Sequence, residues 1–173
     1  ASARFPLVGV PICTDLGLSQ PMVCSPYPGG LVLADRKLCT VSRFDADNKI
    51  VCSTTLAGCQ VHWLEVAHRS TGNVFAHCGE QLLCLSADLT ILWQREHGDD
   101  FCLSGRLDPT ESYILCTFTN AARQMAVMEK KSGAGCLSFL ITLSVVDGTV
   151  CQTDWLQHED ASERICRLGS SLG

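Results

Sequence analysis

Cysteine and histidine are the residue types here with the most chemical potential, since the chain holds 12 cysteines and five histidines among its 173 residues. A structural zinc site usually takes its ligands as tight pairs, such as Cys-x-x-Cys. The closest cysteine pairs are Cys52 with Cys59 and Cys78 with Cys84, separated by six and five residues, and no Cys-x-x-Cys occurs. His77 adds one nitrogen beside Cys78. This spacing does not predict a metal site, and we assign no metal ligand.

A histidine, an aspartate and a cysteine in suitable order also suggest a cysteine protease. The stretch NVFAHCG around His77 resembles the histidine segment of chymotrypsin-like viral cysteine proteases, with Asp99 or Asp100 to orient the base and Cys136 in GAGCLS as the nucleophile. Such enzymes place a glycine after the nucleophile to expose the N–H groups of the oxyanion hole. Leu137 stands there instead. We assign no catalytic residue and keep the protease as an alternative.

The residues that surround the cysteines indicate whether the thiols are reduced or paired in disulfides. Cys52, Cys84, Cys102 and Cys116 all lie inside apolar runs, where a small buried side chain is expected. The asparagines Asn48, Asn73 and Asn120 all fail the glycosylation sequon. We therefore predict reduced thiols and a cytoplasmic protein. The alternative is a secreted protein with six disulfides, as an even cysteine count allows.

Composition excludes several function classes. The net charge is −5, from 13 basic and 18 acidic residues, and no run of Lys and Arg forms a stripe, so we expect no nucleic-acid partner. No apolar stretch approaches the roughly 20 residues that span a bilayer. The glycine pairs Gly29-Gly30 and Gly133-Ala-Gly135 lack the Lys and Ser/Thr of a phosphate loop, so we assign no cofactor.

The elements that must position any site are predicted to be strands. Helical periodicity is nearly absent, whereas short runs of Val, Ile, Leu, Thr, Cys and Phe alternate with Gly, Pro, Asp and Asn. The predicted strands are Gly30 to Ala34, Leu38 to Arg43, Ile50 to Thr54, Val61 to Ala67, Val74 to His77, Gln81 to Ser86, Ile91 to Arg95, Tyr113 to Thr119, Met125 to Glu129, Leu137 to Val145 and Val150 to Trp155.

An internal repeat organises these strands. Three stretches, beginning at Leu38, Leu82 and Leu140, each give an apolar strand ending in Ser, a polar turn with Asp, and a second apolar strand. The turns centre on Asp47, Asp88 and Asp147, with gaps of 41 and 59 residues. Asp147-Gly148 predicts a tight two-residue hairpin turn, Asp47-Asn48 suits one less well and Asp88-Leu89 poorly. The second gap is about 18 residues longer than the first, and we predict that these extra residues form an insertion within Ala121 to Cys136.

Two segments carry a family resemblance. Residues 106–116 (RLDPTESYILC) resemble the opening segment of WD40-type blades, and 82–93 (LLCLSADLTILW) resemble the closing hairpin shared by WD40 and quinoprotein-like propellers. The resemblance covers most of residues 21–157, but Gly-His and Trp-Asp are missing, and only Trp93 matches the quinoprotein closing Trp. It implies an all-β propeller of four-stranded blades. At about 40 to 45 residues a blade, the chain would hold three to four.

A closed ring normally needs four or more blades. Residues 1–173 would therefore be one all-β domain that closes as a small ring, or part of a larger propeller completed by a missing segment or another chain. A β-trefoil is the alternative architecture, although Gln60-Val61-His62 and Gln94-Arg95-Glu96 do not match the Gln-x-Trp of trefoil lectins.

These observations predict a non-enzymatic protein-interaction module or scaffold subunit. Its partners would be basic or neutral proteins, because its own surface is mildly acidic. Ala121 to Cys136 is the segment we expect to face a partner, and the sequence identifies no other partner-binding residue. The rival functions are a secreted, cysteine-rich, trefoil-type lectin, for which Trp63, Trp93 and Trp155 would be sugar platforms, and the cysteine protease described above.

Overall fold

The computed structural model describes residues 19, 21–58, 60–97, 100–120 and 138–156. Within these ranges the regular elements are β-strands joined by turns, as the alternation of apolar runs and turn residues predicts. No helix in the described part of the chain has the length and apolar character to cross a membrane. The predicted strand Met125 to Glu129 and the expected partner-facing segment Ala121 to Cys136 lie outside the described residues.

In the described residues, twelve strands form three separate four-stranded antiparallel sheets, each of which follows the order of the chain. The first blade contains β1 (Pro21–Tyr27), β2 (Gly30–Asp35), β3 (Thr40–Asp45) and β4 (Ile50–Thr55). The second contains β5 (Val61–Val66), β6 (Val74–Cys78), β7 (Gln81–Leu85) and β8 (Ile91–Glu96). The third contains β9 (Asp100–Leu107), β10 (Tyr113–Asn120), β11 (Ser138–Ser144) and β12 (Val150–Leu156).

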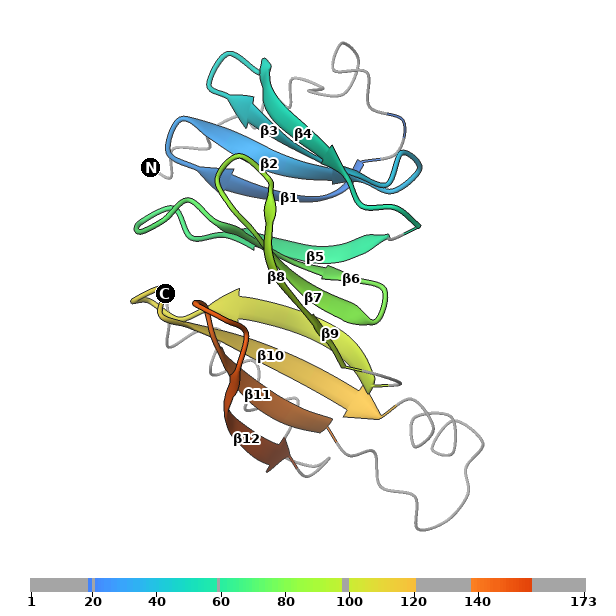
Figure 1. The fold of residues 1–173 in the computed structure, drawn as a ribbon, viewed down its shortest axis with the longest axis vertical. Helices are drawn as coiled ribbons and strands as arrows, with labels where there is room; N and C mark the ends of the chain where they lie inside the picture. The colour runs from blue at the N-terminus through green and yellow to red at the C-terminus, as the bar shows by residue number, and fades with distance from the viewer. Residues whose placement is uncertain (1–18, 20, 59, 98–99, 121–137, 157–173) are drawn as a thin grey trace, which may run out of the picture.

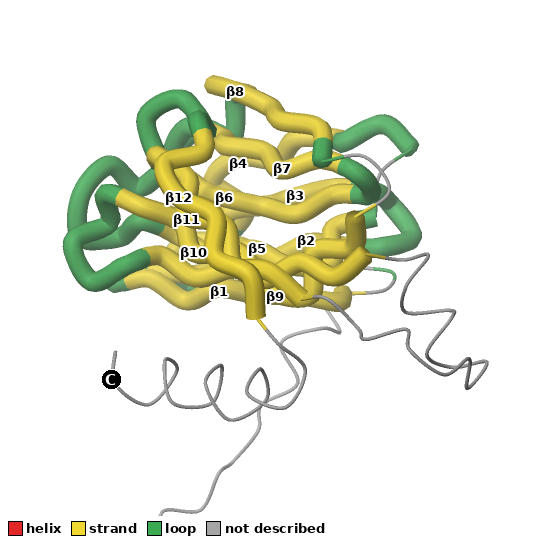
Figure 2. The backbone as a smooth tube through the Cα atoms, turned by 90° about the horizontal axis from the view of Figure 1, so that it is seen from below, coloured by secondary structure: helices red, strands yellow, loops and turns green. Residues whose placement is uncertain are grey.

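The three sheets stack face to face along the long axis of the molecule (Figure 1). β1 lies against β5, and β5 against β9, so the first strands of the blades form what we call the inner row. Figure 2 shows β1, β5 and β9 along one side of the stack and the last strands β4 and β8 toward the other. This is the arrangement of β-propeller blades, and it confirms the predicted architecture with three blades among the described residues. A trefoil would join strands of different repeats, whereas these sheets share no hydrogen-bonded strand.

Two apolar layers hold the blades together. The middle strands are buried on both faces, which explains why β6 and β7 are nearly continuous apolar runs. The layer between blades 1 and 2 includes Val32, Val41, Leu64, Val74 and Leu85. The layer between blades 2 and 3 includes Phe75, Cys84, Ile114, Phe118 and Leu143. Each large side chain buried in this way stabilises the stack by about 1.5–3 kcal/mol.

Cysteines take part in these layers as predicted. Cys84 and Cys116 are fully buried and Cys52 is half-buried, while the side chain of Cys102 lies outside the described part. Burial raises the pKa of the Cys84 thiol to about 12, so this group is neutral and behaves as a small apolar side chain.

Each of the three repeated turns contains one residue in the left-handed backbone conformation. Asn48, Leu89 and Gly148, which directly follow the repeat aspartates, have φ values of 61°, 66° and 69°. Leu89 adopts this left-handed conformation although it is a poor turn former, because its side chain is buried in the layer between blades 1 and 2. The predicted two-residue turn at Asp147-Gly148 is wrong, since β11 ends at Ser144 and β12 begins at Val150.

The sequence did not predict the two inner strands β1 and β9. β1 contains Pro21 and Pro26, and β9 contains Gly105, all of which argue against a strand in a sequence pattern. Both strands pair on one side only, and an edge position tolerates the missing proline N–H.

Candidate interaction site

A cavity of about 740 Å³ lies along the inner row, and we call it the axial cavity. The inner strands contribute polar side chains on one wall, and the turns after β5 and β9 form another. Leu115 and Leu140 of the third blade add apolar surface. The polar lining includes Ser25, Glu65, His68, Arg69, Arg106 and Glu111.

Glu65 of β5 is a half-buried carboxylate of this lining. Its Oε2 accepts a hydrogen bond of 2.9 Å from the N–H of Leu107, the last residue of β9. Its Oε1 has no hydrogen-bond partner among the residues that the structure describes. Burial raises the pKa of Glu65, and the Glu111 charge adds to this, while the Leu107 N–H, Arg106 and His68 oppose it. A desolvated carboxylate with a spare oxygen, facing a cavity, is suited to receive a cationic group.

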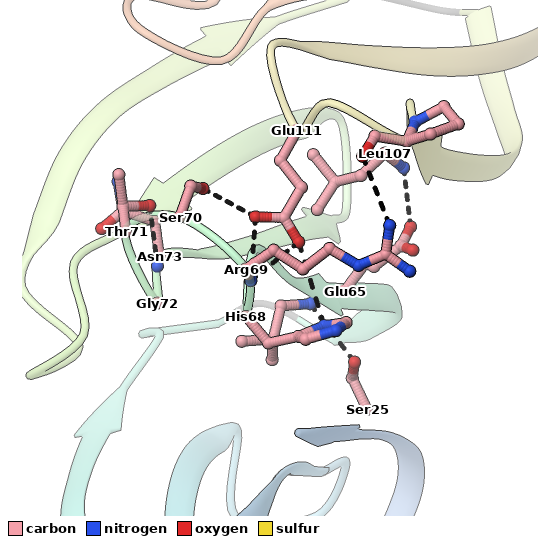
Figure 3. Close-up of polar contacts among 12 residues, drawn as sticks. Ser25, Glu65, His68, Arg69, Ser70, Thr71, Gly72, Asn73, Leu107 and Glu111 are labelled. Atoms are coloured by element: carbon pink, nitrogen blue, oxygen red, sulfur yellow. Dashed lines mark hydrogen bonds and ion pairs between the residues drawn. The ribbon is translucent and has the colours of Figure 1, made fainter. Parts of the chain in front are cut away.

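Glu111 connects blades 2 and 3 through hydrogen bonds, and we call this set of contacts the Glu111 clamp (Figure 3). Only 7% of this residue is exposed, yet its carboxylate accepts hydrogen bonds from the N–H of Arg69, at 3.0 and 3.1 Å, and from the hydroxyl of Ser70, at 2.6 Å. His68 Nδ1 lies 3.9 Å from the same carboxylate. These contacts join the β5–β6 loop to the β9–β10 turn, so this part of the lining of the axial cavity is fixed by charge-assisted bonds.

The β9–β10 turn presents Glu111 in a preset conformation. Glu111 has φ of 55°, and its N–H donates to the Asp108 carbonyl at 2.9 Å. The Asp108 carboxylate in turn accepts the N–H groups of Thr110, Ser112 and Tyr113. Burial alone would raise the pKa of Asp108, but the hydrogen bond from the Thr110 hydroxyl and those from the three N–H groups lower it. The aspartate therefore stays ionised and holds the turn.

Trp63 of β5 also lines the cavity. Its indole N–H donates to the Gly105 carbonyl of β9, and the ring lies directly over Gly105. A Cβ atom at position 105 would overlap that ring. Glycine in β9 thus lets the two inner strands approach each other, which is why this strand carries a residue that weakens its sequence signal.

Three histidines gather at the opposite end of the interface between blades 2 and 3. His77 of β6 is 1% exposed, and its Nε2 lies 2.9 Å from Nε2 of His97. The centres of the His62 and His77 rings lie 5.6 Å apart, and the His97 and Phe118 rings pack edge to face with their centres 5.1 Å apart. Burial, with help from the neighbouring imidazoles, lowers the pKa of His77 to about 4. One imidazole donates and the other accepts, so at least one of the pair is neutral.

Among the described residues, those that the sequence singled out for chemistry do not come together. Neighbouring residues on a strand point to opposite faces, so His77 faces blade 3 while Cys78 packs against blade 1. No three His, Cys, Asp or Glu side chains in the described ranges are placed to hold a metal ion. The proposed protease base, His77, instead pairs with His97. Asp99 and Cys136 lie outside the described residues, as does the side chain of Asp100.

Two of the three tryptophans are packing residues. Trp63 and Trp93 lie beside the layer between blades 2 and 3, where the Trp93 indole donates to the Val145 carbonyl at 3.0 Å. The side chain of Trp155 is outside the described part. The axial site itself had no sequence signal, because Glu65 and Glu111 come from different blades and share no motif.

Comparison with known proteins supports the fold. The amino-acid sequence matches no protein-family model and no curated protein. Among solved structures, the chain is similar to Kuenenia stuttgartiensis hydrazine synthase, with a TM-score of 0.61, 8% identity, and coverage of 80% of this chain and 38% of that one.

Two further solved structures show the same likeness. BamB from Moraxella catarrhalis gives a TM-score of 0.54 at 14% identity, over 83% of this chain and 36% of that one. A functionally unknown protein from Desulfotomaculum acetoxidans gives 0.54 at 13% identity, over 75% and 38%. The chain thus spans less than two fifths of these structures, and the likeness establishes a β-propeller-type fold alone.

Proposed function

We propose that this chain is a non-enzymatic protein-interaction module that binds a protein segment in the axial cavity, with a lysine or arginine side chain against Glu65. The observation that carries the proposal is the half-buried Glu65 carboxylate, which lines the axial cavity and accepts a hydrogen bond from the Leu107 N–H.

The rest of the lining supports a peptide ligand rather than a small anion. Arg69 and Arg106 are balanced by Glu65, Asp108 and Glu111, so the cavity carries no excess of positive charge. Ser25, Ser104 and Thr117 add hydroxyl groups, and Leu115 and Leu140 add apolar surface. This mixture suits a polypeptide, which presents amide groups together with apolar and charged side chains.

Rigidity favours binding over chemistry at this site. The hydrogen bonds to Glu111 and the contact between Trp63 and Gly105 connect the cavity walls of blades 2 and 3. Such a rigid frame is expected for a docking surface. The protein would act as a scaffold subunit, and its buried thiols Cys78, Cys84 and Cys116 support a cytoplasmic location. Titration of free thiols under denaturing, non-reducing conditions should find close to 12; a value near zero would place the protein in an oxidising compartment.

Selection from a random peptide library displayed on phage, with the immobilised protein as bait, tests the proposed function. We expect enriched peptides to carry Lys or Arg at a fixed position. By calorimetry, synthetic copies should bind Glu65→Gln at least tenfold more weakly than the native protein, because the charge pair is lost. Glu96→Gln is the matched control, since Glu96 is an exposed residue of the outer strand β8.

Two results would count against the proposal. One is enrichment of peptides without a basic residue. The other is equal binding by the native protein and Glu65→Gln, provided that urea denaturation shows both proteins to be folded.

A further inference from the structure

A second surface of this protein has a repeated composition, and it lies on the outer strands, away from the inner row. Most of the exposed large apolar side chains in the described residues lie at the same end of the blades, at or beside the starts of β4, β8 and β12. They are Ile50, Val51, Ile91, Leu92, Val146 and Val150. Val51 is 60% exposed and Leu92 is 54% exposed, so these side chains project into solvent.

The same backbone irregularity recurs near these side chains in every blade. The pairing of each outer strand shifts by one residue at Arg43/Phe44, Cys84/Leu85 and Thr142/Leu143. The extra residues are therefore Val51, Leu92 and Cys151, each at the second position of its strand. A β-bulge twists an edge strand and re-aims a side chain. Its recurrence in all three blades makes these projections a repeated feature.

Acidic turns lie between the apolar positions. Asp47, Asp88 and Asp147 stand at the tips of the turns that precede β4, β8 and β12. Lys49 is the one cation within these three turns, and Arg95 of β8 reaches the third turn, where it donates to the Gly148 carbonyl at 3.3 Å. Hydrogen bonding to Ser86 lowers the pKa of Asp88, and hydrogen bonding to Thr149 lowers the pKa of Asp147. Both carboxylates are fully exposed and ionised at neutral pH.

Contacts between blades make the surface continuous. The Cys52 thiol of β4 lies 3.8 Å from the Ala87 carbonyl in the next turn, and Asp88 acts electrostatically on that thiol. Trp93 of β8 donates to the Val145 carbonyl of the third turn. Apolar strand starts and acidic turns thus alternate from blade to blade along what we call the outer rim, which contains Asp47, Ile50, Val51, Asp88, Ile91, Leu92, Val146, Asp147 and Val150.

We infer that the outer rim is a docking surface for a protein segment in which basic side chains alternate with aliphatic ones. Charge complementarity selects this occupant: the exposed carboxylates recur between the apolar positions, and the whole chain carries a net charge of −5. A segment lying along the rim would place its aliphatic side chains on Val51 and Leu92 and its lysines or arginines on Asp88 and Asp147. This site is separate from the axial cavity and stands without it.

Fluorescence anisotropy with three labelled 12-residue peptides tests the rim. One peptide alternates Lys and Leu, one has Glu for Lys, and one has Ser for Leu. We expect the Lys/Leu peptide to bind at least tenfold more tightly than the other two, with affinity that falls as salt rises. The double variant Val51→Ser/Leu92→Ser should weaken binding at least tenfold, and Asp88→Asn/Asp147→Asn should remove most of the salt dependence.

Two control variants test whether the peptide binds at the outer rim. Leu38→Ser removes an exposed leucine at the other end of the blades and should leave binding unchanged. Glu65→Gln should also leave it unchanged, so failure of the rim and failure of the axial cavity are distinguishable.

Binding that neither double variant alters, or that the Glu peptide matches, would overturn the inference. Sedimentation velocity adds a further outcome: self-association abolished by Val51→Ser/Leu92→Ser would assign the rim to a second copy of this chain instead.

Discussion

The paired histidines make the stability of the blade 2–blade 3 interface depend on pH. In the folded protein, His77 has a pKa of about 4, because it is buried and lies beside His97 and His62. In the unfolded chain an ordinary imidazole has a pKa of about 6.5. The unfolded state therefore binds more protons between these two values. The contribution of His77 is complete above pH 6.5, and it is lost as the pH falls toward 4.

The size of the effect follows from the two pKa values. Each unit of difference is worth about 1.4 kcal/mol, so the difference of about 2.5 units corresponds to roughly 3 kcal/mol in full. At pH 5 the loss relative to neutral pH is about 2 kcal/mol. The free energy of unfolding of small domains is about 5–15 kcal/mol, so this is a readily measured fraction.

His77→Phe is the perturbation that isolates this effect, since it keeps a ring in the layer and removes the titrating group. At pH 7 the variant should be less stable by about 1–3 kcal/mol, because His97 loses its buried hydrogen-bond partner. The gap between the native protein and the variant should then shrink by about 2 kcal/mol between pH 7 and pH 5. Urea denaturation followed by tryptophan fluorescence measures both quantities.

Phe75→Leu is the matched control, because it lies in the same strand and the same apolar layer but carries no titrating group. Its stability profile should run parallel to that of the native protein. Native and His77→Phe profiles that also stay parallel from pH 7 to pH 4.5 would refute the reasoning, since His77 would then not be held neutral by the fold.

Two further predictions concern the walls of the axial cavity. Gly105→Ala should lower the free energy of unfolding by about 1–3 kcal/mol, because its Cβ would overlap the Trp63 ring. Gly79→Ala, whose Cβ meets no atom within 4 Å, should cost only about 1 kcal/mol, through its φ of 61°; equal losses in urea denaturation would contradict the close packing. Glu111→Gln should cost about 1–3 kcal/mol, because a neutral amide replaces the ionised acceptor between the loops, and hydrogen exchange at the Arg69 amide should accelerate; unchanged exchange would argue against the clamp.

The sequence predicted the outer and middle strands better than the inner ones, for a physical reason. Strands such as β6 and β7 are buried on both faces, so their apolar runs are long enough to be recognised. The inner strands β1 and β9 carry Pro26 and Gly105, which an edge strand and a close interblade contact allow but which weaken a local pattern. The repeat around Asp47, Asp88 and Asp147 was correct, because the outer hairpins resemble one another most.

The candidate site could not be predicted in the same way. Glu65 meets Leu107, and Glu111 meets Arg69, only after the blades stack. The His77–His97 pair likewise joins residues 20 apart, with no spacing that would mark it. Conversely, the turn at Leu89 looked unsuitable locally, yet burial of its side chain outweighs the strain. Local patterns report on strands and turns, whereas these contacts depend on how separate sheets pack.

The central claim, that a basic side chain of a partner segment meets Glu65 in the axial cavity, is tested most directly at the amide of Leu107. This N–H donates to the Glu65 carboxylate in the free protein, so its NMR resonance reports any charge placed on that group. Titration with a lysine-bearing peptide from the library selection should shift the Leu107 amide signal strongly in the native protein and much less in Glu65→Gln. A bound peptide that shifts signals elsewhere and leaves the Leu107 amide unmoved would contradict the account.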